Sequence, residues 1–119
     1  VLTLSGDVMR QVFEKSLSLE YGLVQFSGIK LSYDSRRPIG DRLVDANVGG
    51  EALQGDRQYR LVTGSFTATG GENYQMFEGL PLSMSDVLVS DALIKEFKKA
   101  GDLAIPELGR QIDLAPLAK

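Results

Sequence analysis

Cysteine and histidine are both absent from the 119-residue sequence. Without cysteine the chain can form neither disulfide bonds nor thiolate ligands, although this absence fits an oxidising compartment as well as a reducing one. Histidine is the commonest metal ligand and general base, so a zinc or two-metal hydrolytic site would need carboxylates alone. We therefore predict no catalytic residues and no metal ligands in this chain, and we do not expect it to catalyse hydrolysis by itself.

Clustered positive charge and long hydrophobic runs are also missing. The formal net charge is −3, and lysine and arginine are scattered along the chain. A surface for nucleic acid or anionic membrane would need a basic patch, so no nucleic-acid partner is predicted. No apolar run is long enough to cross a bilayer, and residues 1–4 lack the layout of a signal peptide. No membrane span is predicted, and any targeting segment is expected outside this chain.

The composition that remains is that of an ordinary globular domain, with 43% hydrophobic and 24% charged residues. The pattern reads as a helix, then several hairpin-connected strands, then a second helix, with no internal repeat. This order predicts an α+β fold: a mixed, mainly hairpin-connected β-sheet with helices packed on it. One domain is expected over residues 1–114, and residues 115–119 are expected to form a tail.

Two segments carry apolar residues at helical spacing. The first is predicted to begin at Ser5-Gly6 and to be broken at Tyr21-Gly22, and the second to begin with Ser85-Asp86 as its cap and to end before Gly101. Their apolar positions are Val8, Val12, Phe13 and Leu17 in the first, and Val89, Leu93, Ile94 and Phe97 in the second. Three polar side chains of the first helix are expected to face solvent, namely Arg10, Glu14 and Lys15.

Alternation of apolar and polar residues predicts the strands. Residues 1–4 and 110–114 are expected to be strands, the latter at an edge, and a turn is expected at residues 34–41, where Arg36 and Arg37 are interpreted as solvated. Gly49-Gly50 is typical of a tight hairpin. The inward positions of the other strands are Ile29, Leu31 and Tyr33, then Val44, Ala46 and Val48, then Tyr59, Leu61 and Thr63. Tyr33, Tyr59 and Phe26 are interpreted as packing residues, not as ligand contacts.

The stretch of residues 64–74 contains glycine, serine, threonine and asparagine around one phenylalanine. It is too polar for a core and too rich in glycine for a regular element, so we predict a functional loop. A phosphate-binding P-loop is excluded, because Gly70-Gly71 is followed by no lysine and serine or threonine pair.

Three segments in order resemble the 5′-nucleotidase C-terminal domain: Leu4-Ser5-Gly6, residues 23–34 with residues 38–42, and residues 59–74 with their Phe66 and Gly70-Gly71 turn. The resemblance implies a two-domain hydrolase of nucleotides or related phosphoesters that acts outside the cytoplasm, as a periplasmic, secreted or cell-surface enzyme. Two divalent metal ions would be held by an N-terminal metallophosphoesterase domain, and this domain would bind the nucleoside. The resemblance also implies that the upstream part of this domain, with a second stacking phenylalanine, is absent here.

The same resemblance assigns the substrate-binding residues. Phe66 matches an aromatic residue that stacks on the base, and Glu72 stands where the family has an aspartate that accepts hydrogen bonds from the ribose hydroxyls. Gly70 and Gly71 would let the backbone approach the ligand, and Asn73 stands where the family usually has glycine. The alternatives are that Phe66 belongs to the core and that Glu72 is a solvated turn residue.

Two further hypotheses belong to other classes. The domain could serve chiefly for docking or for dimerisation as a homodimer, for which exposed helices would suffice. Alternatively, the parent enzyme could act on a UDP-sugar or a cyclic nucleotide, because the family's substrate range is wide and Glu72-Asn73 departs from its usual turn.

Overall fold

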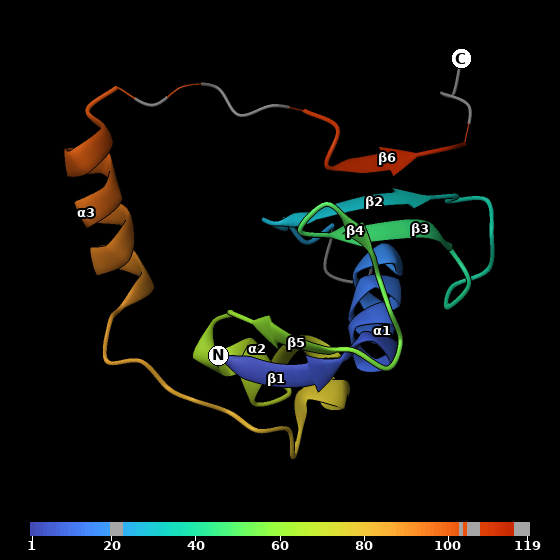
Figure 1. Cartoon of the computed structure of the whole chain (residues 1–119), viewed down its shortest axis with the longest axis horizontal. Helices are drawn as coiled ribbons and strands as arrows, with labels where there is room; N and C mark the ends of the chain where they lie inside the picture. The colour runs from blue at the N-terminus through green and yellow to red at the C-terminus, as the bar shows by residue number, and fades with distance from the viewer. Residues whose placement is uncertain (20–22, 103, 105–107, 116–119) are drawn as a thin grey trace.

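The computed structural model describes residues 1–19, 23–102, 104 and 108–115 (Figure 1). Its mixed sheets and helices confirm the predicted α+β class. In chain order the elements are β1 (Leu2–Ser5), α1 (Gly6–Leu17), β2 (Ile29–Tyr33), β3 (Leu43–Val48), β4 (Glu51–Ala52), β5 (Gln58–Leu61), α2 (Ser65–Ala68), η1 (Gly71–Asn73), η2 (Gln75–Phe77), α3 (Val89–Ala100) and β6 (Gln111–Asp113).

Helix α1 lies between two sheets, where the sequence predicted one (Figure 1). The Ser5 hydroxyl caps it by accepting from the Val8 N–H at 3.3 Å, as the Ser5-Gly6 start predicted. The helix ends at Leu17, and the break predicted at Tyr21-Gly22 lies outside the described residues. Its buried face fills the centre of the molecule with Met9, Val12, Phe13, Ser16 and Leu17.

The solvent position predicted for Glu14 is wrong. Its two carboxylate oxygens accept the backbone N–H groups of Arg42 and Leu43 at 3.0 and 2.6 Å, where β3 begins. Arg42 in turn donates from Nη1 to the Leu17 carbonyl at 2.8 Å, which satisfies a carbonyl in the last turn of α1. These bonds join the helix to the sheet.

The larger sheet has the strand order β4-β3-β2-β6. Strands β2 and β3 are antiparallel and are joined through the turn at residues 34–41, and the hairpin of β3 and β4 turns at Gly49-Gly50, both as predicted, while β6 lies parallel to β2 at the edge. Ile29, Leu31 and Ala46 are buried, but Val44 is exposed, contrary to its predicted inward position. The register shifts at this point, because Ser32 pairs with Asp45 and Tyr33 with Leu43. Val44 is the extra residue of a bulge, and Leu43 is buried in its place.

The smaller sheet pairs β1 with β5, so that Leu2 lies opposite Leu61 and Leu4 opposite Tyr59. On the other side of β1, Thr3 N–H donates to the Pro81 carbonyl at 3.0 Å and Ser83 N–H to the Val1 carbonyl at 2.8 Å. Leu2 and Leu4 are almost completely buried against the α1 side of the core.

Helix α3 departs from the prediction in two respects. Its N-cap residue is Leu88 without a side-chain cap, because the Ser85 hydroxyl accepts from Val87 N–H at 3.1 Å in a turn before the helix. The helix also packs on neither sheet, since all described residues from 81 to 104 are exposed and α3 stands apart from the rest of the chain (Figure 1). Its end before Gly101, whose N–H donates to the Phe97 carbonyl, is as predicted. No helix of the described segments is long and apolar enough to span a membrane.

Candidate functional site

The segment of residues 64–78 is more regular than the loop that its composition predicted. It forms α2, η1 and η2 in succession, held by short backbone bonds such as Ala68 N–H to the Gly64 carbonyl at 2.9 Å and Phe77 N–H to the Tyr74 carbonyl at 3.1 Å. Ala68, Tyr74 and Phe77 are buried, and the Tyr74 and Phe77 rings stack with centroids 5.6 Å apart. Three buried side chains therefore fasten a polar segment to the core.

Phe66 lies on the outside of this segment, with 69% of its surface exposed, so the alternative of a core phenylalanine is wrong. The ring is nevertheless supported, because it lies against the backbone of Gly71. A Cβ added to Gly71 would come within 2.6 Å of Phe66 Cδ1 and Cε1. Glycine at position 71 thus leaves room for the ring, whose other side is accessible.

The turn after α2 uses unusual backbone conformations. Gly70, Glu72 and Asn73 have φ values of 98°, 56° and 63°, in the left-handed region that favours glycine and, among other residues, asparagine. A Cβ on Gly70 would also come within 2.7 Å of Glu78 Oε1. The turn is therefore specified by backbone freedom at Gly70 and by tight packing at both glycines.

The Glu72 carboxylate is exposed next to this turn. Burial raises the pKa of Tyr74 above its usual value, and the negative charge of Glu72 adds to that rise, which indicates that the two side chains are close. The segment thus presents a supported aromatic ring and a free carboxylate from residues 66 and 72. Asn73 is exposed as well.

A metal site is not found in the part of the chain that the structure describes, where no three histidine, cysteine, aspartate or glutamate side chains gather. A surface hollow of about 420 Å³ lies elsewhere, where β2 begins and β3 ends, beside the Gly49-Gly50 turn. Its lining is Gly28, Ile29, Lys30, Asn47, Gly49, Gly50 and Arg110, and it shares no residue with the 64–78 segment. This lining contains neither an aromatic ring nor a carboxylate, whereas residues 66–73 present both, so we place the candidate site at residues 66–73.

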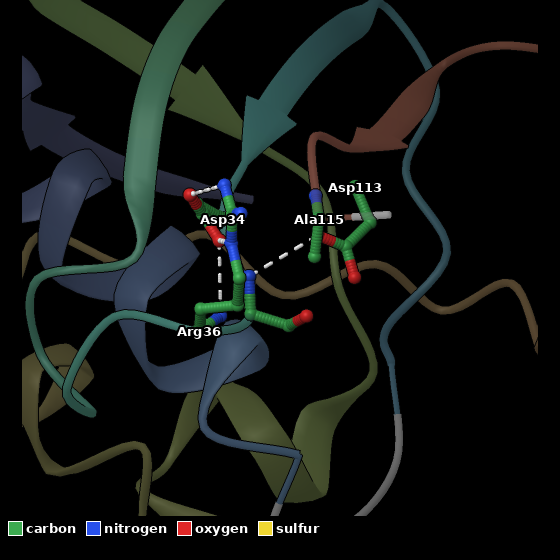
Figure 2. Close-up of polar contacts among 5 residues, drawn as sticks. Asp34, Arg36, Asp113 and Ala115 are labelled. Atoms are coloured by element: carbon green, nitrogen blue, oxygen red, sulfur yellow. Dashed lines mark hydrogen bonds and ion pairs between the residues drawn. The ribbon is translucent and has the colours of Figure 1, made fainter. Parts of the chain in front are cut away.

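An ion pair lies at another place, between Asp34 and Arg36 (Figure 2). The Asp34 carboxylate accepts from Arg36 Nε at 2.9 Å, from Nη2 at 2.7 Å and from the backbone N–H at 3.0 Å. These bonds lower the pKa of Asp34 to about 2. Sequence reasoning missed this pair, although an aspartate two residues before an arginine in a turn is a usable signal.

Asp113 lies beside this pair and joins β6 to the turn (Figure 2). Its Oδ1 accepts from Ser35 N–H at 3.1 Å and from Ala115 N–H at 3.0 Å. The pKa of Asp113 is lowered, first by a hydrogen bond with the Ser35 side chain and then by these backbone bonds. Both carboxylates accept hydrogen bonds that hold the turn and β6 in place, so we assign this cluster a structural role and not a catalytic one.

Comparison with known proteins gives three findings. A family model described as "5'-nucleotidase, C-terminal domain" matches residues 1–79, which include all five candidate site residues. A snake venom 5'-nucleotidase of Crotalus adamanteus is 29% identical over an alignment that covers 94% of this chain and 21% of that protein. An apyrase of Tabanus yao is 29% identical, with 90% of this chain and 22% of that protein covered.

A solved structure has the same fold. The 5'-nucleotidase precursor from Thermus thermophilus superimposes with a TM-score of 0.86 at 21% identity, and the match covers 97% of this chain and 25% of that one. The chain thus spans about a fifth to a quarter of the length of these relatives.

Proposed function

Since this chain belongs to the 5′-nucleotidase C-terminal domain family, we propose that it recognises the nucleoside part of a nucleotide for a longer, metal-dependent phosphoester hydrolase. Phe66 stacks on the base, and Glu72 accepts hydrogen bonds from the ribose hydroxyls. The observation that carries this proposal is the state of the Phe66 ring, which is 69% exposed and yet supported from behind by Gly71. A ring with one supported face and one accessible face can stack on a base.

The energetics favour this arrangement. Stacking of a base on an aromatic side chain contributes about 1–3 kcal/mol and tolerates any base, since every base has a π face. A ring that is already held in place loses little conformational entropy on binding. The anchoring of residues 64–78 by Ala68, Tyr74 and Phe77 supplies this preorganisation.

Glu72 suits the sugar contact because an ionised carboxylate only accepts hydrogen bonds, and the ribose hydroxyls donate them. Its left-handed backbone conformation turns the chain sharply between Gly71 and Asn73. Gly70 and Gly71 carry no side chains that would keep a ligand from the backbone.

The chemistry itself lies outside this chain in the proposed scheme. A preceding metallophosphoesterase domain would hold two divalent metal ions, which supply the activated water and neutralise charge on the phosphate. The enzyme would act outside the cytoplasm, as the venom origin of one relative suggests.

The test uses the full-length enzyme and compares a nucleotide with a phosphoester that has no base and no other aromatic ring, such as ribose 5-phosphate. Phe66→Ala is expected to raise KM for AMP by about fivefold to 150-fold, following the stacking energy, and to leave turnover of the base-free ester unchanged. Val62→Ala is the matched control, because Val62 is an exposed apolar residue nearby. An unchanged KM for AMP in Phe66→Ala would rule out the stacking role.

A second variant tests the sugar contact. Glu72→Gln is expected to weaken binding of AMP more than binding of 2′,3′-dideoxy-AMP, which lacks both hydroxyls. Equal losses for the two nucleotides would show that Glu72 does not contact the ribose.

A further inference from the structure

Helix α3 carries an apolar face that no described residue covers. Val89, Leu93 and Phe97 are spaced four residues apart, so they form one stripe along the helix, with Ile94 beside it. These four side chains are between 49% and 67% exposed. The opposite side of the helix carries Asp91, Lys95 and Lys98. This is the pattern of a helix that packs on a hydrophobic partner.

The described part of the chain does not hold α3 in its position. The hydrogen bonds recorded around the helix are local, from Ala92 N–H to the Leu88 carbonyl at 3.0 Å and from Gly101 N–H to the Phe97 carbonyl at 3.0 Å. The last bonds between the preceding segment and the body join Ser83 to Val1. No described hydrogen bond outside the helix and its ends therefore fixes the placement of α3.

The same overall arrangement occurs in a much longer protein. The likeness to the Thermus thermophilus structure extends over 97% of this chain but only 25% of that one, with a TM-score of 0.86. Because the matching family model describes a C-terminal domain, most of the additional length of such proteins precedes the matched region.

The pairing at Val1 indicates where a preceding segment would run. Val1 N and its carbonyl oxygen bond to the Ser83 carbonyl and N–H at 2.7 and 2.8 Å, and Leu2 lies opposite Leu82 in an antiparallel bridge. Continuing this antiparallel register places residues before Val1 alongside residues 84–88, which lead into α3. In Figure 1 the N-terminus lies on the side of the body toward α3.

We propose that the apolar face of α3 is covered by the segment of the same polypeptide that precedes Val1. That segment extends the β1 pairing with residues 81–83 and then places apolar side chains against Val89, Leu93 and Phe97. A tethered segment reaches the helix at high effective concentration, which gives it an advantage over a second copy of the chain.

The absence of cysteine from this chain makes a labelling experiment possible. In the full-length polypeptide, Leu93→Cys is compared with Lys95→Cys, and the rate of maleimide modification at each site is followed by peptide mass spectrometry. Leu93→Cys is expected to react at least about tenfold more slowly than Lys95→Cys in the native protein, and equally fast in urea. Val89→Cys, one turn earlier on the same face, is the second variant if Leu93→Cys does not fold.

Equal native rates at positions 93 and 95 would overturn the proposal. Protection of Leu93→Cys that is lost on dilution would overturn it as well, because the cover would then be a second copy of the chain. Protection that is independent of concentration in the full-length protein, and lost when the preceding segment is cut away, is the expected result.

Discussion

Gly6 determines how α1 meets the turn before β5. Its N–H donates to the Arg57 carbonyl at 2.9 Å, and the N–H of Asp7 donates to the Gly55 carbonyl at 3.0 Å. A Cβ added to Gly6 would overlap the carbonyl group of Gln54. Glycine is needed here for space and not for a left-handed backbone, since its φ is not positive.

Gly6→Ala is therefore expected to destabilise the fold by about 1–3 kcal/mol, the range for overpacking that forces the backbone to shift. Urea unfolding followed by circular dichroism measures the change. Gly64→Ala is the control, because Gly64 has φ −65° and an added Cβ there would meet nothing within 4 Å. Similar stability for the two variants would mean that the turn before β5 can shift away from the added methyl group with no loss of folding free energy.

Single residues were predictable only where a local pattern or the family resemblance pointed to them. The resemblance led to Phe66 and Glu72, and the structure leaves both exposed. The hydrogen bonds from the Arg42 and Leu43 N–H groups to Glu14 were missed, because the partners are 28 and 29 residues away and no periodicity reports such a contact. Val44 was misplaced for a similar reason, since a bulge is set by the partner strand.

Elements whose apolar residues recur at a regular spacing were predicted well, as α1, β2 and the β2–β3 hairpin show. The short helices of residues 65–77 were not predicted, because three or four residues carry no periodic signal and their burial of Tyr74 and Phe77 is a tertiary effect. The predicted N-cap of α3 was wrong because the Ser85 hydroxyl can accept from a backbone N–H in a turn as readily as at the start of a helix.

The position of strand β6 depends on hydrogen bonds to charged side chains. It is held to β2 by parallel pairing and to the 34–41 turn by Asp113, while Asp34 and Arg36 fix the shape of that turn. The pKa of Asp34 is lowered to about 2, first by its hydrogen bonds to the Arg36 side chain and backbone. The folded chain therefore favours the ionised form. This contribution to stability is complete above the ordinary value near 3.8 and is lost as the pH falls toward about 2.

Arg36→Ala is expected to raise the pKa of Asp34 toward its ordinary value, because the two side-chain bonds are lost and only the backbone bond remains. A carboxyl-carbon NMR titration from pH 6 to 1.5 measures this directly. Arg37→Ala should shift the pKa much less, since Arg37 acts on Asp34 only through its charge. If Asp34 titrates alike in wild type and Arg36→Ala, the pair seen in Figure 2 does not persist in solution.

At the largest scale, the 119-residue chain is more extended than its length requires. Its radius of gyration is 15.6 Å, whereas a compact domain of this size has about 13.5 Å. The difference comes from α3, which stands away from the body in Figure 1, and from the exposed residues 81–88 that lead to it. The sequence predicted the amphipathic character of α3 but not its separation, because the pattern of one helix does not reveal its partner.

This separation predicts where a protease cuts the 119-residue chain. A helix of 12 residues without tertiary packing is marginally stable in water, so α3 should open far more often than α1. Trypsin is expected to cleave after Lys95, Lys98 and Lys99 at least about tenfold faster than after Arg10, which is also exposed but lies on the packed helix α1. Mass spectrometry of a time course gives both rates. Equal resistance at the two helices would mean that α3 finds its cover within this chain or on another copy, and the preceding segment would then not be needed to explain its position.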